Sequence, residues 1–207
     1  MSEEKKTSIF IGYVHPPMIL HYFMECMYVQ VTDKKYDMVV QPVGSGPNIS
    51  TSRNHLVERF LDSPCDYFLA IDTDISWHPE QVDMLMAHDK DIVSGLYHSH
   101  GEKAIVWPVY LKLTDDGFFE RPKLSDVENA TELMSVGAVG MGFCLIKRRV
   151  FEELGASNLW PFAEIMGVNG KYQGEDITFC ARAREKGFEI YLDPNVKVMH
   201  TKLMPVF

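Results

Sequence analysis

The sequence predicts an α/β fold: a single Rossmann-like domain built on a mixed, mostly parallel central sheet. Strand-like and helix-like segments alternate along the first hundred residues, in the β-α-β-α-β-α-β order that gives parallel strands joined by right-handed crossovers. One of these strands, Tyr67–Ile71, is an unbroken apolar run, which is typical of a strand buried on both faces. The 207 residues, of which 46% are hydrophobic, are enough for one such domain with a sizeable core.

Four strands and three helices are expected in the first half. The predicted strands are Ser8–Val14, Asp37–Val43, Tyr67–Ile71 and Asp91–Tyr97. A helix is expected near Ile19–Gln30, and another begins at His78-Pro79-Glu80, because proline is favoured at the first helical position. Between them Leu56, Val57, Phe60 and Leu61 share one helical face, and Ser50, Thr51 or Ser52 is expected to cap that helix.

The second half has shorter elements. Ala104–Leu113 and Phe118–Arg121 are expected to be antiparallel pieces joined by a hairpin turn at Thr114–Gly117. Val136–Lys147 reads as one apolar strand, in which Gly137, Gly140 and Gly142 mark either the close approach of a ligand or backbone, or a bulge.

The last predicted helix is Glu175–Lys186, with Gly187 as the residue that ends it. Phe188–Leu192 and Val196–Met199 are expected to close the chain as short strands. No internal repeat or interdomain linker is seen, so residues 1–207 are expected to form one domain.

Charge and composition narrow the class of partner and compartment. The net charge of −9, without a prominent basic patch, disfavours nucleic acid as a partner. The longest near-apolar stretch, Met134–Ile146, is too short to span a membrane, and residues 1–6 are not followed by a signal-peptide core. The four cysteines are scattered without a C-x-x-C pair, which predicts reduced core thiols and a cytoplasmic protein.

Asp72-Thr73-Asp74 is the strongest functional signal. It follows the buried strand Tyr67–Ile71, and residues i and i+2 of a strand point to the same face. Two converging carboxylates repel each other unless a cation or hydrogen-bond donors offset the charge. Oxygen ligands suit Mg²⁺ or Mn²⁺, which bind substrate phosphates in their open positions, so the motif predicts a metal–diphosphate site. The alternative is an ordinary helix cap or a solvated turn.

Three further features carry candidate chemistry, each with a structural alternative. Arg53-Asn54 opens a helix and could receive a phosphate or nucleotide, or could be an ordinary helix start. Glu175 and Asp176 lie in the first turn of the last helix, where the dipole favours acids and a general base could also sit. His200 is a late histidine that could complete an oxygen-rich metal site, or belong to the core or surface.

Taken in order, these segments resemble the GT-A-fold glycosyltransferases, most closely the family 2-like enzymes, over roughly residues 7 to 202. The matching segments are Ser52–Asn54, Asp72–Asp74, Gly137–Gly142, Leu145–Arg148, Phe151–Gly155, Gly174–Ile177 and Val196–His200. The first strand's loop lacks the Asn/Glu-rich stretch common in that family, and Gln41 stands near the place of its uracil-pairing acid.

The resemblance implies a metal-dependent enzyme that moves a sugar from a nucleotide donor, first of all a UDP-sugar, to an unidentified acceptor hydroxyl. Residues 1–100 would form the nucleotide- and metal-binding half, and residues 101–207 the acceptor and catalytic half. Trp160-Pro161-Phe162 would offer an aromatic acceptor platform, or would be a buried loop.

The resemblance also implies a role for each matched residue. Asp74 and His200 would hold Mn²⁺ or Mg²⁺, with Asp72 in the metal shell or on the ribose. Donor contacts would come from Arg53, Asn54 and Asp72, and Gly140 and Gly142 would let the donor sugar approach the backbone. Asp176, with Glu175 beside it, would deprotonate the acceptor for an inverting transfer.

Other functions are also compatible with the motifs. Asp72-Thr73-Asp74-Ile75-Ser76 loosely fits the D-x-D-x-T/S pattern of haloacid-dehalogenase phosphotransferases, although that fold places the pattern on its first strand. A non-catalytic nucleotide-sugar-binding module would keep the same fold. A zinc hydrolase would use His98 and His100, but the spacing supplies no third ligand.

Overall fold

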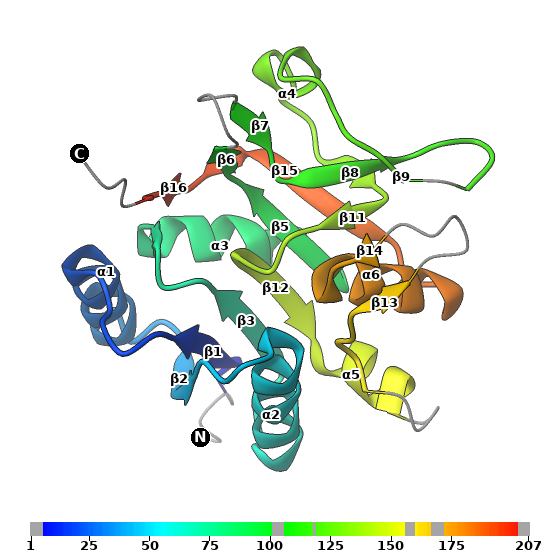
Figure 1. Cartoon of the computed structure of the whole chain (residues 1–207). Coiled ribbons are helices and arrows are strands. Elements are labelled where there is room, and N and C mark those ends of the chain that lie inside the picture. Colours follow the sequence, from blue (N-terminus) through cyan, green and yellow to red (C-terminus); the bar gives the residue numbers. More distant parts are fainter. Residues whose placement is uncertain (1–5, 101–105, 118, 156–159, 167–171, 203–207) are drawn as a thin grey trace, which may run out of the picture.

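The central sheet of the computed structural model has seven strands among the described residues, which are 6–100, 106–117, 119–155, 160–166 and 172–202 (Figure 1). Its strands are β1 (Ser8–His15), β2 (Asp37–Gly44), β3 (Tyr67–Ile71), β5 (Ile92–Leu96), β10 (Met134–Val136), β12 (Phe143–Lys147) and β15 (Ile190–Lys197). Their order across the sheet is β10-β15-β5-β12-β3-β1-β2.

Most of these strands run in one direction. β1 pairs in parallel with β2 and β3, and β15 pairs in parallel with β5. β12 is antiparallel to both β3 and β5, and β10 is antiparallel to β15. The mixed, mostly parallel sheet predicted from the sequence is therefore confirmed. β12, from the second half of the chain, lies between β3 and β5.

Helices cover both faces of the sheet (Figure 1). α1 (His21–Thr32) and α3 (Pro79–Ala87) pack on one face, and α2 (Ile49–Asp62), α5 (Arg148–Gly155) and α6 (Glu175–Glu185) pack on the other. A short helix, α4 (Ser125–Glu128), lies beyond the sheet. The arrangement is a three-layer α/β/α sandwich, as expected for parallel strands joined by helices.

Two hydrophobic cores result, one on each face, because side chains alternate along a strand. On β1, Ile9 and Ile11 enter the core beneath α1 and α3, whereas Phe10 enters the core beneath α2. The Phe10 ring lies 5.6 Å from the Phe60 ring of α2, centroid to centroid. Each such fully buried side chain contributes roughly 1.5–3 kcal/mol by leaving water.

The helix ends show what local sequence can and cannot predict. α2 is capped by Asn48, whose side chain accepts hydrogen bonds from the backbone N–H groups of Ser50 and Thr51. The expected cap at Ser50, Thr51 or Ser52 is wrong, because the helix begins before those residues. Gly187 follows α6 with a φ of +86°, which supports the predicted end of that helix.

The segment predicted as one strand, Val136–Lys147, is three strands. β10 pairs with β15, β11 (Ala138–Val139) pairs with β8 (Tyr110–Leu113), and β12 lies in the middle of the sheet. A side chain at Gly137 would come within 3.0 Å of the backbone of Lys112 and Leu113. Gly137 thus allows the close approach of β8, and the single-strand prediction is wrong because the segment is divided between two sheets.

Small strand pairs complete the fold. β8 pairs with β9 (Phe119–Glu120) across the predicted hairpin turn, in which Gly117 has a φ of +82°. Where two short strands were expected at the end, β15 is continuous, with an irregularity between Asp193 and Lys197. The remaining strands are β4 (Ile75–Ser76), β6 (His98–His100), β7 (Val106–Pro108), β13 (Ile165–Met166), β14 (Tyr172–Gln173) and β16 (Met199–His200).

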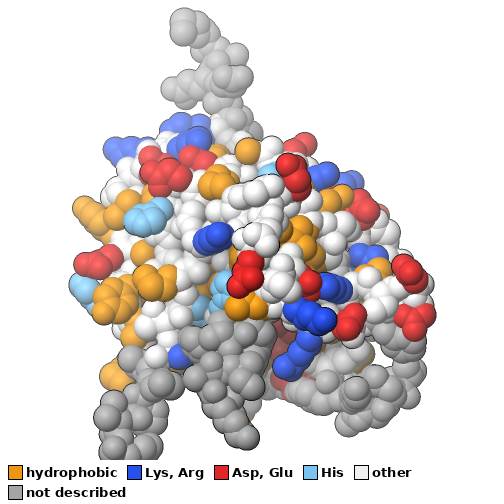
Figure 2. All heavy atoms as spheres, turned by 90° about the horizontal axis from the view of Figure 1, so that it is seen from above, with side chains coloured by type: hydrophobic (Ala, Val, Ile, Leu, Met, Phe, Trp, Pro, Cys, Tyr) orange, Lys and Arg blue, Asp and Glu red, His pale blue; other side chains and the backbone are white. Residues whose placement is uncertain are grey.

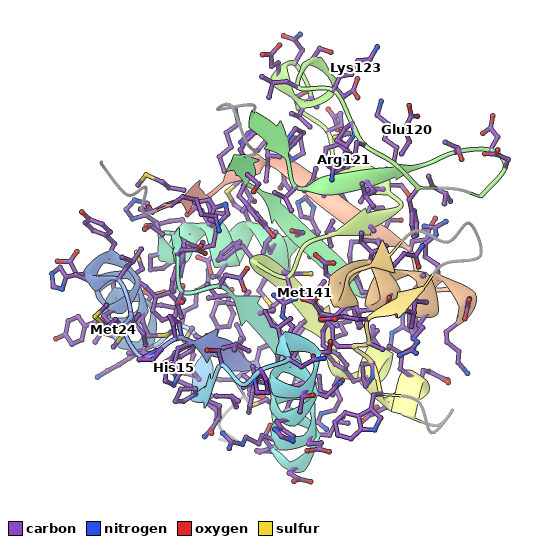
Figure 3. All side chains as sticks on the ribbon, in the orientation of Figure 1. His15, Met24, Glu120, Arg121, Lys123 and Met141 are labelled. Atoms are coloured by element: carbon purple, nitrogen blue, oxygen red, sulfur yellow. The ribbon has the colours of Figure 1, made fainter. Side chains whose placement is uncertain are left out.

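The surface carries charges of both signs. On the face shown in Figure 2, the Lys and Arg side chains of the described residues are interspersed with Asp and Glu. Met24 on α1 is among the exposed apolar side chains and lies at the outside of the molecule in Figure 3. None of the helices within the described ranges has the length and apolar character that crossing a membrane requires.

Candidate active site

The Asp72-Thr73-Asp74 turn lies at the carboxyl end of β3, where open α/β sheets form their ligand crevices. Its backbone is anchored: the Asp72 N–H donates to the Gly142 carbonyl at 3.0 Å, and the Ile75 N–H donates to the Asp72 carbonyl at 3.0 Å. The turn lines a cavity of about 410 Å³. The two carboxylates are therefore held on a fixed backbone beside a space large enough for a ligand.

Asp74 is surrounded by the end of the chain. The Thr201 N–H donates to the Asp74 carbonyl at 2.8 Å, and the Lys202 ammonium lies 2.9 Å from Asp74 Oδ2. His200 Nε2 lies 3.1 Å from the same oxygen, because β16 pairs with β4 and sets His200 opposite Ile75. Burial alone would raise the pKa of Asp74, but the hydrogen bonds from His200 and Lys202 lower this pKa to about 2.

His200 is oriented by its second ring nitrogen. Nδ1 lies 2.8 Å from the backbone carbonyl of His98, which can only accept, so Nδ1 carries a proton. Nε2 then faces the Asp74 carboxylate, and two acceptors do not attract each other unless a proton or a cation lies between them. The hydrogen bond with Asp74 raises the pKa of His200 accordingly. A histidine fixed in this way is typical of metal ligands.

Asp72 has a different partner. Arg53 of α2 is buried, with a side chain only 10% exposed, and its guanidinium contacts Asp72 Oδ1 at 3.2 Å and the carboxylate of Glu175. Burial opposes the charge of Arg53, but Asp72, Glu175 and Asp176 together raise its pKa. Arg53 therefore joins α2, the end of β3 and the start of α6 through charged contacts.

Glu175 and Asp176 occupy the first turn of α6, as predicted. Asp176 Oδ1 accepts a hydrogen bond from the Ile177 N–H at 2.7 Å. Burial raises the pKa of Asp176, and it also raises the pKa of Glu175, although the charge of Arg53 opposes both shifts. The start of α6 therefore carries two carboxylates whose pKa values are both raised.

The residues present fit a divalent cation in part. Asp74 and His200 bring a carboxylate and an oriented imidazole together, and both are suitable ligands for Mn²⁺. Asp72 faces Arg53 instead, and no group of three or more His, Cys, Asp or Glu side chains within the described ranges could hold a metal. A cation here would take its remaining ligands from water and phosphate, as Mg²⁺ sites commonly do.

Gly140 and Gly142 leave room for the Tyr97 side chain in this structure. A Cβ on Gly142 would lie 2.7 Å from the Tyr97 ring, and one on Gly140 would clash with the Tyr97 hydroxyl. That hydroxyl accepts a hydrogen bond from the Gly142 N–H at 2.9 Å. Met141 between them is buried at the centre of the molecule (Figure 3). The donor-sugar role of the two glycines stays a prediction.

Two further expectations need correction. The Asn54 side chain is buried and bonds both ways to the Phe162 backbone, at 2.7 and 3.0 Å, so it fastens α2 to the loop before α6 rather than facing a donor. Phe162 itself is in the core, and only Trp160 of the expected aromatic platform is strongly exposed, at 51%.

The two histidines of the zinc alternative are not seen to form a metal site in the part of the chain that the structure describes. His98 contributes its backbone carbonyl to His200, and the His100 side chain lies outside the described residues.

Lys202 and Tyr97 contact site residues but were not predicted from the sequence to do so. The signal for Lys202 was its spacing, because residues two apart in an extended segment point the same way, and His200 and Lys202 both reach Asp74. Tyr97 gave no local signal, since its partners Gly140 and Gly142 are more than forty residues away along the chain.

Solved structures with folds similar to this chain include two that are informative here. The chain is similar to A197 from STIV, with a TM-score of 0.54 and 14% sequence identity over 97% of both chains. It is also similar to GalNAc-T7, whose crystal structure contains UDP, GalNAc and Mn²⁺, with a TM-score of 0.64 and 13% identity. That match covers 98% of this chain and 45% of GalNAc-T7, so the chain spans less than half of that protein.

The fold is GT-A-like. The predicted fold class is thus confirmed, and the likeness at 13–14% identity concerns the fold alone. No model of a known protein family matches the chain, and no curated protein sequence matches it either.

Proposed function

We propose that this protein is a glycosyltransferase that moves a sugar from a nucleotide-diphosphate donor, first of all a UDP-sugar, to an acceptor hydroxyl. One observation carries the proposal: Asp74 and His200 meet beside a cavity at the carboxyl end of β3, in a fold similar to one crystallised with UDP, GalNAc and Mn²⁺. A binding cavity with converging carboxylate and imidazole groups supports a metal-assisted reaction on a phosphorylated ligand.

Asp74 and His200 would hold the divalent cation, Mn²⁺ or Mg²⁺, with Asp72 next to it. When bound, such a cation stabilises negative charge that develops on the departing diphosphate. Arg53 keeps Asp72 and Glu175 in place by its two ion pairs, so its first role in this proposal is to position the donor side of the site. Direct contact of Arg53 with the nucleotide is a further part of the proposal.

Asp176 would accept the proton of the acceptor hydroxyl, which fits an inverting transfer. Its burial and raised pKa favour proton uptake, and its hydrogen bond to the Ile177 N–H fixes its orientation. Glu175 shares the raised pKa but is paired with Arg53, so Asp176 is the better candidate of the two. The acceptor would enter from the side of Trp160 and the start of α6.

The proposed compartment is the cytoplasm. All four cysteines are free, and Cys65, Cys144 and Cys180 are buried in the core, as expected for a protein in a reducing environment. The proposed division of labour remains a nucleotide- and metal-binding half, 1–100, and an acceptor and catalytic half, 101–207.

The test is donor binding, measured by thermal shift and calorimetry with UDP and UDP-sugars, with and without Mn²⁺. A donor at 100 times its Kd should stabilise the fold by about 2.7 kcal/mol. Asp74→Asn should abolish the Mn²⁺ dependence of UDP binding, because it removes the charged ligand, while leaving the fold intact. His200→Ala should weaken Mn²⁺ binding less, since water can replace a neutral imidazole.

Release of UDP from a UDP-sugar separates an enzyme from a non-catalytic binding module, because a binder releases none. A wild-type protein that binds neither UDP nor any tested nucleotide sugar would remove the proposal. A covalent phospho-aspartyl intermediate would instead favour the phosphotransferase alternative.

A further inference from the structure

Lys202 lines the cavity beside Asp72–Asp74, and the proposed function has not yet given this residue a role. Its ammonium lies 2.9 Å from Asp74 Oδ2, the same oxygen that faces His200 Nε2 at 3.1 Å. Its side chain is 46% exposed, and it lines the cavity together with Asp72, Thr73 and Asp74. The contact is thus a half-exposed ion pair on the cavity wall, which ligand binding can exchange for another partner.

The charge of the cavity wall explains why such an exchange is needed. Of the described residues that line the cavity, Asp72 and Asp74 are anionic, and Lys202 alone is cationic. Arg53 is buried and paired with Asp72 and Glu175. A diphosphate entering beside two carboxylates meets repulsion that Lys202 or an added cation can offset.

A divalent cation and Lys202 also compete for one atom. A metal bound to Asp74 Oδ2 would stand within a few ångströms of the ammonium, where two positive charges repel. Lys202 must then leave Asp74, and its flexible four-carbon stem lets the ammonium move while the backbone stays paired. The released ammonium remains at the wall of the same cavity and is a good point-charge ligand for phosphate.

We propose that Lys202 is a phosphate-binding residue of the donor site, which rests on Asp74 in the empty site and moves to the donor's diphosphate when a nucleotide and metal enter. The inference rests on the proposed function and adds a specific ligand to it. Asp74 would then pair with the Lys202 ammonium in the empty site and with the divalent cation in the occupied site.

Calorimetric titrations of Lys202→Met, Lys202→Arg and wild type test this, with UDP in saturating Mn²⁺ as one probe and Mn²⁺ alone as the other. Lys197→Met is the matched control, because Lys197 lies nearby on the same segment but lines a different cavity. Thermal unfolding of each variant checks that it is folded. Lys202→Met should weaken UDP binding by about 10-fold or more, the usual effect of losing a hydrogen bond to a charged group.

Lys202→Arg and Lys197→Met should bind UDP close to wild type. For Mn²⁺ alone, Lys202→Met should bind about 1.5- to 5-fold more tightly than wild type, as expected when a partly exposed competing ion pair is removed. Unchanged UDP affinity in Lys202→Met, or an equal loss in Lys197→Met, overturns the inference while the proposed function stands. Mn²⁺ affinity that is unchanged or lower in Lys202→Met also overturns it. Wild type that does not bind UDP overturns both proposals.

Discussion

The pKa values of two carboxylates of this site, Asp74 and Asp176, are shifted in opposite directions by their surroundings. Burial opposes the charge of Asp74, but the hydrogen bonds from His200 and Lys202 lower its pKa to about 2, so it is ionised at every physiological pH. Burial raises the pKa of Asp176, which lies in the first turn of α6. Carboxylates whose environments push their pKa values apart suit separate roles, one as a constant negative charge and one as a proton acceptor.

Asp176→Asn tests the proton-acceptor role. The amide keeps the size of the side chain but cannot take up the proton, so sugar transfer should fall by roughly 10²–10⁴-fold while the Kd for UDP stays close to wild type. The measurement is kcat for transfer beside Kd for UDP, with Glu175→Gln as the neighbouring control. Near-normal kcat in Asp176→Asn would refute the base assignment.

The same substitution should also stabilise the protein at neutral pH. Because the folded state raises the pKa of Asp176, wild type loses stability as the pH rises from the usual value of 3.8 through the higher folded value. Asp176→Asn has no carboxyl group to ionise at this position and therefore does not lose stability in this way. Its melting temperature should therefore exceed that of wild type at pH 7, and the difference should vanish near pH 3. A lower melting temperature at pH 7 would mean that the helix-dipole contribution of Asp176 outweighs its burial.

At the scale of elements, α2 organises the site by its first two turns. Its cap, Asn48, satisfies two backbone N–H groups, and Arg53 one turn later reaches both β3 and α6. Asn54 then fastens the helix to the loop that carries Phe162. The start of one helix thus fixes the position of Asp72 and Glu175.

Asn48→Ala should lower the free energy of unfolding by about 0.5–2 kcal/mol, the usual cost of losing a helix cap. Urea denaturation measures it. Thr51→Ala, at an exposed position in the same helical turn, is the control and should stay within about 0.5 kcal/mol of wild type. Equal effects in the two variants would contradict the capping role.

Arg53→Ala should cost more, about 3–5 kcal/mol, because it leaves the carboxylate of Glu175 buried without its partner. Adding Glu175→Gln to Arg53→Ala should recover part of that loss, which a double-mutant cycle would measure. Arg149→Ala provides the contrast, since the Arg149 side chain is 63% exposed and its ion pair with Asp91 should contribute no more than about 1 kcal/mol. A small loss in Arg53→Ala would mean that the buried ion pairs are not needed to hold α2 in place.

At the scale of the whole molecule, the sequence predicted the elements better than their pairing. Tyr67–Ile71 and the N-terminal bounds of β1 and β2 could be predicted because their apolar patterns are local. The position of β12 could not, since it depends on residues 67–71 and 92–96 meeting residues 143–147 across long separations. The Asp74–His200 contact was expected from the resemblance, whereas the ion pair between Arg53 and Glu175 was not, because no local pattern links residues 122 positions apart.

Residues 1–100 alone should not fold, although they contain β1, β2, β3 and β5. Without β12, β3 and β5 each lose a neighbouring strand, and β5 also loses β15, so backbone N–H and C=O groups along their edges have no partner. Circular dichroism during urea unfolding should show no cooperative transition for this fragment, whereas the full chain should show one. A cooperative transition in the fragment would mean that the first half is an independent domain.

The central place of β12 also has a consequence for biosynthesis. As the chain emerges from the ribosome, β3 and β5 are complete long before residue 147, so each waits with an unpaired edge. Such edges are templates for pairing with other chains, and long-range pairings form slowly. The nascent polypeptide therefore passes through an aggregation-prone interval that begins when β3 ends at residue 71 and lasts at least until β12 ends at residue 147. Its yield should depend on chaperone supply and translation speed more than the stability of the finished protein suggests.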